Sequence, residues 1–160
     1  MNPLIQSRNA TILPVLIALM LGCFGLSPRA QAVCQEGCLT SSNTALGEDA
    51  LWNTTGSFNT ALGFNALFTN TTGTGNTASG EEALLSNTTG SFNTANGVDA
   101  LFNNTTGNNN TATGHAALYY NTGNNNIAIG QAAGIDLTTG SDNIDIGNAG
   151  VAGESGIIRI

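Results

Sequence analysis

Few residues of this chain could do chemistry. The single histidine, His115, has no cysteine and no pair of carboxylates near it in the sequence. The acidic pairs Glu48-Asp49 and Glu81-Glu82 supply carboxylates, but adjacent residues of an extended strand point to opposite sides. Neither pair can therefore act as general acid and general base on one substrate. We expect no catalytic residue and no enzyme activity.

Metal and cofactor binding have little support. Cys34 and Cys38 are two thiols without a nearby histidine or further cysteine, which makes an incomplete zinc site. In an oxidising compartment we expect a small local disulfide loop, with pairing between chains as the second interpretation and metal binding as the third. The stretch from Asp142 to Asp145 suggests calcium only loosely, because it lacks the glycine-rich nonapeptide of calcium β-rolls. We expect no metal and no cofactor.

The N-terminus has the pattern of a secretory signal peptide over residues 1–32. A weakly basic start is followed by the apolar residues 10–26 and by an Ala-x-Ala sequence, which predicts cleavage between Ala32 and Val33. A proline and a glycine interrupt the apolar run, so we expect no transmembrane segment in the mature chain. The alternative is a lipoprotein acylated at Cys23.

The predicted mature chain is strongly acidic. Arg159 is its one basic residue against ten acids, a formal charge of −9, and the chain has no lysine. Such a surface repels phosphates and anionic lipid headgroups, so nucleic-acid binding is not expected. We expect the protein to be secreted and extracellular, or to lie at the cell surface if a missing C-terminal part anchors it in the outer membrane.

A repeat of 16 or 17 residues dominates the rest of the chain. Each unit opens with an asparagine and has alanine two positions later, except for Asp145 in the last unit, and glycine four positions later. The asparagines are Asn43, Asn59, Asn76, Asn93, Asn110, Asn126 and Asn143, and the glycines are Gly47, Gly63, Gly80, Gly97, Gly114, Gly130 and Gly147. A unit this short excludes a helical hairpin and favours one coil of a solenoid.

Further positions of the unit also recur. Alanine lies seven positions after the asparagine in the first six units, and leucine follows it in the first five. Nine positions after the asparagine come large residues: Trp52, Phe68, Leu85, Phe102, Tyr119 and Ile135. We expect these columns to supply the buried side chains. Units close with a turn such as Asn70-Thr71-Thr72-Gly73, whose asparagine and glycine suit a left-handed backbone. One unit thus reads as a strand, a glycine corner, a second short strand and a glycine turn.

These features predict an all-β fold, a parallel β-solenoid or β-roll of about seven coils over residues 43–160. A short segment, residues 33–42, holds the two cysteines and precedes it. Stacked coils place identical side chains above one another, so we expect the asparagines to form a hydrogen-bonded ladder. They are better explained as scaffold than as a site.

Two apolar columns have no place inside so thin a coil. In a strand, Leu46 and its counterparts face away from Ala45, and the adjacent residues Leu51 and Trp52 also point to opposite sides. Exposed apolar stripes on a solenoid usually mark an interface. We therefore expect self-association about a symmetry axis.

The units Asn59-Thr60-Ala61-Leu62-Gly63 and Asn126-Ile127-Ala128-Ile129-Gly130 resemble the Ala-Ile-Gly signature of the head repeats in YadA-like trimeric autotransporter adhesins, and the resemblance covers residues 43–160. It implies a left-handed, homotrimeric β-roll at a bacterial surface that attaches to host matrix or to other, abiotic surfaces, and it implies no catalytic residues. This repeat is longer than the family's head repeat, and no heptad stalk or C-terminal β-barrel follows. We expect either that the chain is a fragment or that its anchoring and capping come from elsewhere.

Two other functions remain open. A passive fibre or spacer segment fits a repeat without a distinctive variable patch. An ice-binding or surface-binding solenoid is suggested by a column of threonines at one position of the unit: Thr44, Thr60, Thr77, Thr94 and Thr111. The neighbouring column, which begins at Leu46, is irregular and argues against ice binding.

Glycan attachment is a further formal possibility. The closing turns of the first four units hold an asparagine that satisfies the Asn-x-Thr pattern: Asn53, Asn70, Asn87 and Asn104. Because they share one place in the repeat, turn chemistry already explains them.

Overall fold

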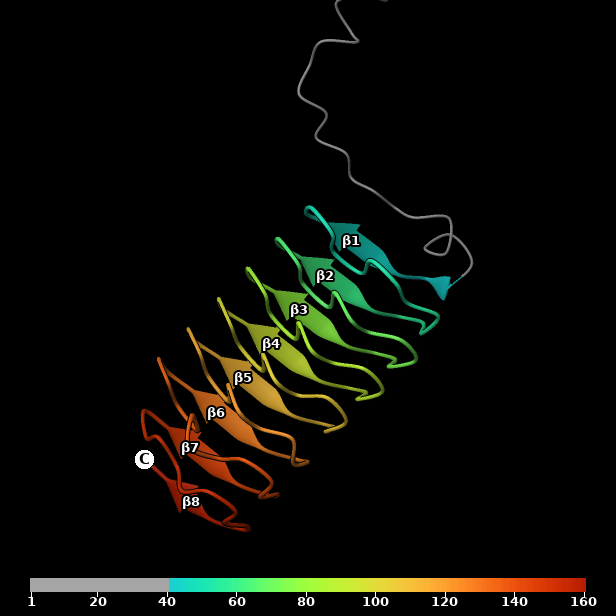
Figure 1. The fold of residues 1–160 in the computed structure, drawn as a ribbon. Coiled ribbons are helices and arrows are strands. Elements are labelled where there is room, and N and C mark those ends of the chain that lie inside the picture. Colours follow the sequence, from blue (N-terminus) through green and yellow to red (C-terminus); the bar gives the residue numbers. More distant parts are fainter. Residues whose placement is uncertain (1–40) are drawn as a thin grey trace, which may run out of the picture. The chain divides into compact units, whose positions relative to one another are not determined.

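The computed structural model describes residues 41–160, which form a β-solenoid (Figure 1). Its strands are β1 (Thr44–Leu46), β2 (Thr60–Leu62), β3 (Thr77–Ser79), β4 (Thr94–Asn96), β5 (Thr111–Thr113), β6 (Ile127–Ile129), β7 (Ile144–Ile146) and β8 (Ile158–Arg159). They form one sheet in sequence order, and every neighbouring pair is parallel. The all-β solenoid predicted from the repeat is confirmed.

Several predictions fall outside this part of the chain. The signal peptide, its cleavage site, Cys23 and the pair Cys34 and Cys38 all precede the described residues. Within residues 41–160, no helix has both the length and the apolar character needed to cross a membrane.

Each strand residue pairs with its counterpart one unit later. Thr44 faces Thr60, and Ala45 faces Ala61, across β1 and β2. The same register holds whether the unit has 16 or 17 residues, so the length difference is absorbed outside the strands. It also continues into β8, where Ile144 faces Ile158.

The eighth strand was not part of the predicted repeat. Its coil has no opening asparagine, because Ile157 occupies that place. Its backbone N–H still donates to Asn143 Oδ1 at 3.1 Å, as the opening asparagines do in earlier coils. The backbone pattern thus extends one coil beyond the side-chain pattern.

The core is a narrow stack of alanine and leucine side chains. The buried alanines are Ala45, Ala61, Ala78, Ala95, Ala112 and Ala128 on the strands and Ala50, Ala66, Ala83, Ala100, Ala117 and Ala133 after the corner. The leucine column consists of Leu51, Leu67, Leu84, Leu101 and Leu118, each at most 2% exposed. In each of these coils the small alanine of the strand and one leucine are buried in the interior, and the size of these side chains sets the thickness of the solenoid.

The large column was expected to be buried, and this is wrong. Trp52 is 50% exposed, and Phe68, Leu85, Phe102, Tyr119 and Ile135 are partly exposed. In each of the first five coils, the alanine and the leucine that precede the large residue are both buried and fill the narrow interior. The interior of each of these coils has room for one large side chain, and the leucine takes it, so the side chain of the next residue stays outside.

The second short strand of each unit is also absent. Asp49 and Leu51 have φ of 58° and 52°, and their counterparts in the following coils repeat these left-handed angles. A left-handed residue at every second position prevents an extended strand. Hydrogen bonds between coils persist, since the Leu51 N–H donates to the Ala66 carbonyl at 3.0 Å. The left-handed backbone therefore lies at the buried leucines and not at the Asn-Thr-Thr-Gly turn.

Two glycine columns let neighbouring coils approach closely. Gly80 has φ of 145°, and a Cβ there would lie 2.4 Å from the carbonyl oxygen of Gly97. At the turn, a Cβ on Gly90 would lie 2.4 Å from the carbonyl oxygen of Gly107. Any side chain at these places would push the coils apart, which explains why each unit repeats both glycines.

Candidate binding faces

One side of the solenoid is a flat sheet face, formed by the first and third residues of β1 to β7. The first positions are Thr44, Thr60, Thr77, Thr94, Thr111, Ile127 and Ile144, and the third positions are Leu46, Leu62, Ser79, Asn96, Thr113, Ile129 and Ile146. The middle residue of each strand is buried. The prediction that the column beginning at Leu46 points outward is confirmed.

The sheet face has no ionisable side chain over β1–β7, although the predicted mature chain is strongly acidic. It is apolar at both ends, where Leu46 is 59% and Ile129 45% exposed. In the middle it is polar, with Ser79, Asn96 and Thr113. A flat, uncharged face of this kind suits contact with another flat surface, either a second copy or a solid.

The opposite side has an aromatic column, which we define as Trp52, Phe68, Leu85, Phe102, Tyr119 and Ile135. The rings of Phe102 and Tyr119 stack with centroids 4.9 Å apart and an interplanar angle of 7°. Tyr120 meets Tyr119 edge to face at 4.7 Å and is 54% exposed. Stacking at the spacing of the coils holds the rings in place and leaves their edges to solvent.

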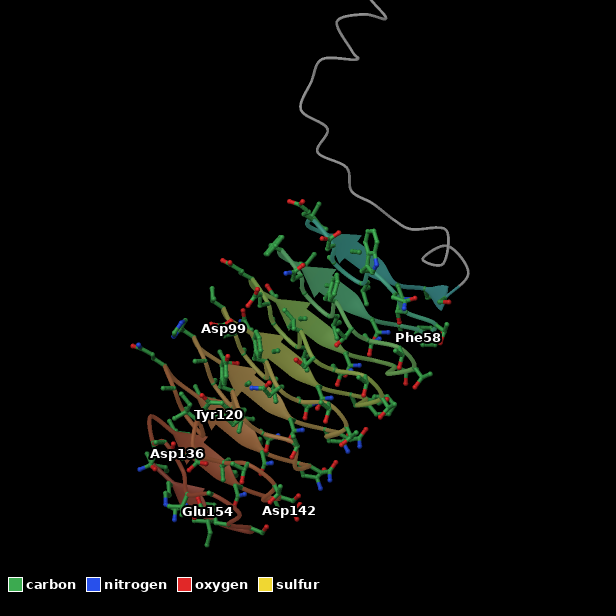
Figure 2. All side chains as sticks on the ribbon, in the orientation of Figure 1. Phe58, Asp99, Tyr120, Asp136, Asp142 and Glu154 are labelled. Atoms are coloured by element: carbon green, nitrogen blue, oxygen red, sulfur yellow. The ribbon has the colours of Figure 1, made fainter. Side chains whose placement is uncertain are left out.

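Carboxylates flank the aromatic column. Burial raises the pKa of the Tyr119 hydroxyl, and the charges of Asp99, Tyr120 and Glu82 raise it further. Two acidic side chains from different coils therefore act on one aromatic residue. Figure 2 shows Asp99 at the left-hand edge of the solenoid, while Phe58 and Asp142 lie at the right-hand edge.

The asparagine column forms the predicted ladder, but most of its hydrogen bonds go to the backbone. Asn76 Oδ1 accepts the N–H of Asn93 at 2.9 Å, and Asn76 Nδ2 donates to the Gly90 carbonyl at 2.8 Å. The other members repeat this pattern. Each buried amide thus joins a strand start to a turn, which agrees with its interpretation as scaffold.

A second buried amide column lies in the closing turns. Asn87 Nδ2 donates to Asn70 Oδ1 at 2.7 Å and to the Gly90 carbonyl at 2.9 Å. In the first coil, Thr54 takes this inward place, because Asn70 Nδ2 donates to Thr54 Oγ1 at 2.9 Å. Asn53 is therefore exposed one position earlier and does not align with Asn70 as the repeat suggested.

This column also bears on the glycan sites. Asn70, Asn87 and Asn104 have no exposed surface, so in the folded chain their amides are closed to a glycosylating enzyme. Of these four turn asparagines, Asn53 alone is exposed. The turn explanation therefore holds for the other three.

The last coils depart from the repeat in two buried places. Gly134 takes the place of the leucine, and Leu137 lies where earlier coils have the turn asparagine and is fully buried. A Cβ on Gly134 would lie 2.7 Å from Leu118 Cδ2 and 3.4 Å from Leu137 Cδ1. Leu137 thus fills the space of the missing leucine from the opposite side of the coil.

Asp145 replaces alanine in β7 and is fully buried. Neither of its carboxylate oxygens has a hydrogen-bond partner. Burial raises the pKa of Asp145, Glu154 raises it further, and Arg159 opposes both. Arg159 is itself paired with Glu154, the one ion pair within residues 41–160.

The candidate catalytic residues are not brought together. His115, Glu48 and Glu81 are exposed on separate coils. Within residues 41–160, no three side chains of the types that hold metal ions form a group. The closeness of Asp99 and Glu82 to the aromatic column was not predicted. The signal in the sequence is an acid that recurs six positions after the opening asparagine, at Asp49, Glu82 and Asp99.

No protein-family model, curated protein or solved structure matches this chain. The resemblance to adhesin head repeats therefore stays a prediction.

Proposed function

We propose that this protein is an exported, surface-displayed repeat protein that mediates attachment, and that three copies assemble side by side. The observation that carries the proposal is the sheet face. It is flat, has no charge over seven strands, and exposes leucine and isoleucine in a chain that is otherwise acidic. Copies of an acidic chain repel one another through charged faces, so the uncharged face is where they can meet.

The repeat supports attachment by many weak contacts. The aromatic column, on the side that assembly of the copies leaves free, recurs from coil to coil in one register, so a partner that binds one coil weakly meets the next coil at the same position. Linked weak contacts raise overall affinity without any single strong site. The ligand class implied by the resemblance is host matrix or an abiotic surface.

The test uses the full chain, exported by its expression host. We expect light scattering to give the mass of three chains, and we expect the protein to be retained on matrix-coated or bare solid surfaces through extensive washing. A folded trimer that is retained on neither surface would replace attachment with the passive spacer. A folded monomer would remove the trimer and weaken the adhesin comparison.

Binding to ice is the second candidate, because five threonines lie in register on the exposed sheet face. Their methyl and hydroxyl groups repeat at the strand spacing of about 4.8 Å. Thermal hysteresis in the monomer would support this function. Trimer formation through the sheet face would contradict it, since the same face cannot meet both.

A further inference from the structure

We propose that the aromatic column and the carboxylates beside it bind a basic, extended polypeptide segment. The inference rests on the proposed function and deepens it, since it names the chemistry of the partner. It concerns the side of the solenoid opposite the sheet face, which the assembly of copies leaves free.

The aromatic column offers ring surfaces to cationic side chains in four of its six coils. Trp52 in the first coil and Tyr120 in the fifth are 50% and 54% exposed. The rings of Phe102 and Tyr119 stack between the fourth and fifth coils, and Tyr120 meets Tyr119 edge to face. Guanidinium groups pack against aromatic rings and interact favourably with their π-electrons. Each exposed contact of this kind is weak, so several have to act together.

The acids beside this column have no cationic partner in the described part of the chain. The single ion pair of residues 41–160 joins Arg159 and Glu154 in the last coil. The carboxylates three positions before a member of the column are Asp49, Glu82 and Asp99, and the Leu85 N–H donates to the Glu82 carbonyl at 3.2 Å. The whole chain has no lysine to neutralise them. An arginine-rich or lysine-rich segment would supply the missing charge.

The charge pattern also decides against other occupants. A second copy brings its own acids to the same face, so like charges would oppose each other. Anionic lipid surfaces and nucleic acids are repelled for the same reason. A basic polypeptide is attracted over a distance of about 10 Å at moderate salt, and it can then place its side chains on the rings.

The test measures binding of a fluorescent 12-residue peptide of alternating arginine and serine to the full exported chain by anisotropy, at low and at physiological salt. The comparison peptide has glutamine in place of arginine. We expect binding of the arginine peptide alone, weakened at least about tenfold as salt rises. No binding at low salt would overturn the inference.

Variants separate a local site from general attraction. We expect the double variant E82Q/D99N to weaken binding about tenfold, and Y120S, which removes an exposed ring, to weaken it about threefold. The control is D142N, which removes a charge at the opposite edge (Figure 2) and should change binding less than twofold. F102A is a second aromatic variant, with circular dichroism to confirm that it folds.

Two results would contradict the inference. If D142N weakens binding as much as the single variant D99N, which removes the same one charge beside the column, the peptide senses only net charge. If Y120S and a folded F102A both bind normally, the aromatic column is not involved. Retention on a matrix-coated surface without peptide binding would overturn this inference and leave the proposed function standing, whereas peptide binding without retention would do the reverse.

Discussion

The middle coils, from β2 to β5, and the last coils, from β6 to β8, share one backbone register but differ in what fills them. In the middle, alanine and leucine repeat without exception. In the last coils, Leu137 substitutes for the missing leucine, Asp145 replaces alanine, and Gly147 has no neighbour within 4 Å of a Cβ. Parallel pairing of the backbone therefore continues through β6, β7 and β8 although the side-chain repeat does not.

The two regions should differ most in how much stability they lose when a corner glycine is replaced by alanine. Gly80→Ala should lower the free energy of unfolding by about 3 kcal/mol, because its Cβ meets the Gly97 carbonyl at 2.4 Å and its φ is 145°. Gly147→Ala should lower it by about 1 kcal/mol, because Gly147 has a φ of 63° and an open environment. Urea unfolding followed by circular dichroism measures both. Equal losses would mean that close packing of the coils does not distinguish the two regions.

The sixth coil has Gly134 where earlier coils have leucine and Leu137 where they have asparagine. Substitutions can restore the residues of the earlier coils at both positions. Gly134→Leu should lower stability by about 2 kcal/mol through crowding against Leu118 and Leu137. Leu137→Asn should lower it by about 3 kcal/mol through a lost buried side chain. The double variant restores the arrangement of the middle coils, so we expect it to recover at least about 1 kcal/mol relative to the sum. A strictly additive double variant would show that the two residues do not share one space.

Asp145 is expected to make the last coils sensitive to pH. Because its pKa is raised in the folded chain, its contribution favours folding below the unfolded pKa of about 3.9 and is lost as pH rises through the folded pKa. Asp145→Ala should therefore stabilise the last coils by about 1–2 kcal/mol at neutral pH and have little effect at pH 3. Hydrogen exchange of the Ile144 amide, which donates to the Ile157 carbonyl, reports on this region.

Two results decide the Asp145 prediction. Asp142→Asn is the control, since Asp142 is exposed in the same coil and should leave exchange of the Ile144 amide unchanged. A stabilisation by Asp145→Ala that is the same at pH 3 and at pH 7 would contradict the role of ionisation.

The smallest effect is expected at the left-handed residue that precedes each opening asparagine. Phe58 and Phe92 have φ near 60° in the earlier coils, where Asn109 and Asn125 serve in the later ones. Asparagine tolerates this backbone better than phenylalanine, so Phe58→Asn should raise stability by about 0.5–1 kcal/mol in thermal unfolding. Phe92→Asn should gain less, because the Phe92 ring lies over Gly75, 2.8 Å from the place of a Cβ. A loss of stability in Phe58→Asn would mean that its ring makes favourable contacts despite being 71% exposed.

The sequence predicted the parallel stacking of successive coils, the first strand of each unit and the buried alanine and leucine columns, because these residues recur at fixed places in the unit. It did not predict which of the neighbours Leu51 and Trp52 lies inside. Both side chains are large and apolar, so both were expected to be buried. The left-handed φ of Leu51 could not be predicted, because leucine rarely adopts this backbone conformation. The missing second strand has the same cause.

The candidate faces were harder to predict than the fold. The outward direction of Leu46 followed from strand alternation, and this was correct. The position of Asp99 and Glu82 beside Tyr119 depends on neighbouring coils, so a single unit does not reveal it. Asn53 was wrongly aligned with Asn70. The first unit is one residue shorter than the second, and because both turns contain the same residue types, the sequence does not show at which position the residue is missing.

The two 16-residue units lose their residue in the turn, so the strands and the asparagine column keep their register. Among the middle coils, where alanine and leucine repeat without exception, we therefore expect that a whole unit can be duplicated or deleted in the gene while the neighbouring coils keep their register. Each added unit would lengthen the body by about 4.8 Å. The solenoid can thus act as a molecular ruler whose length is set by the number of copies and changes in equal steps.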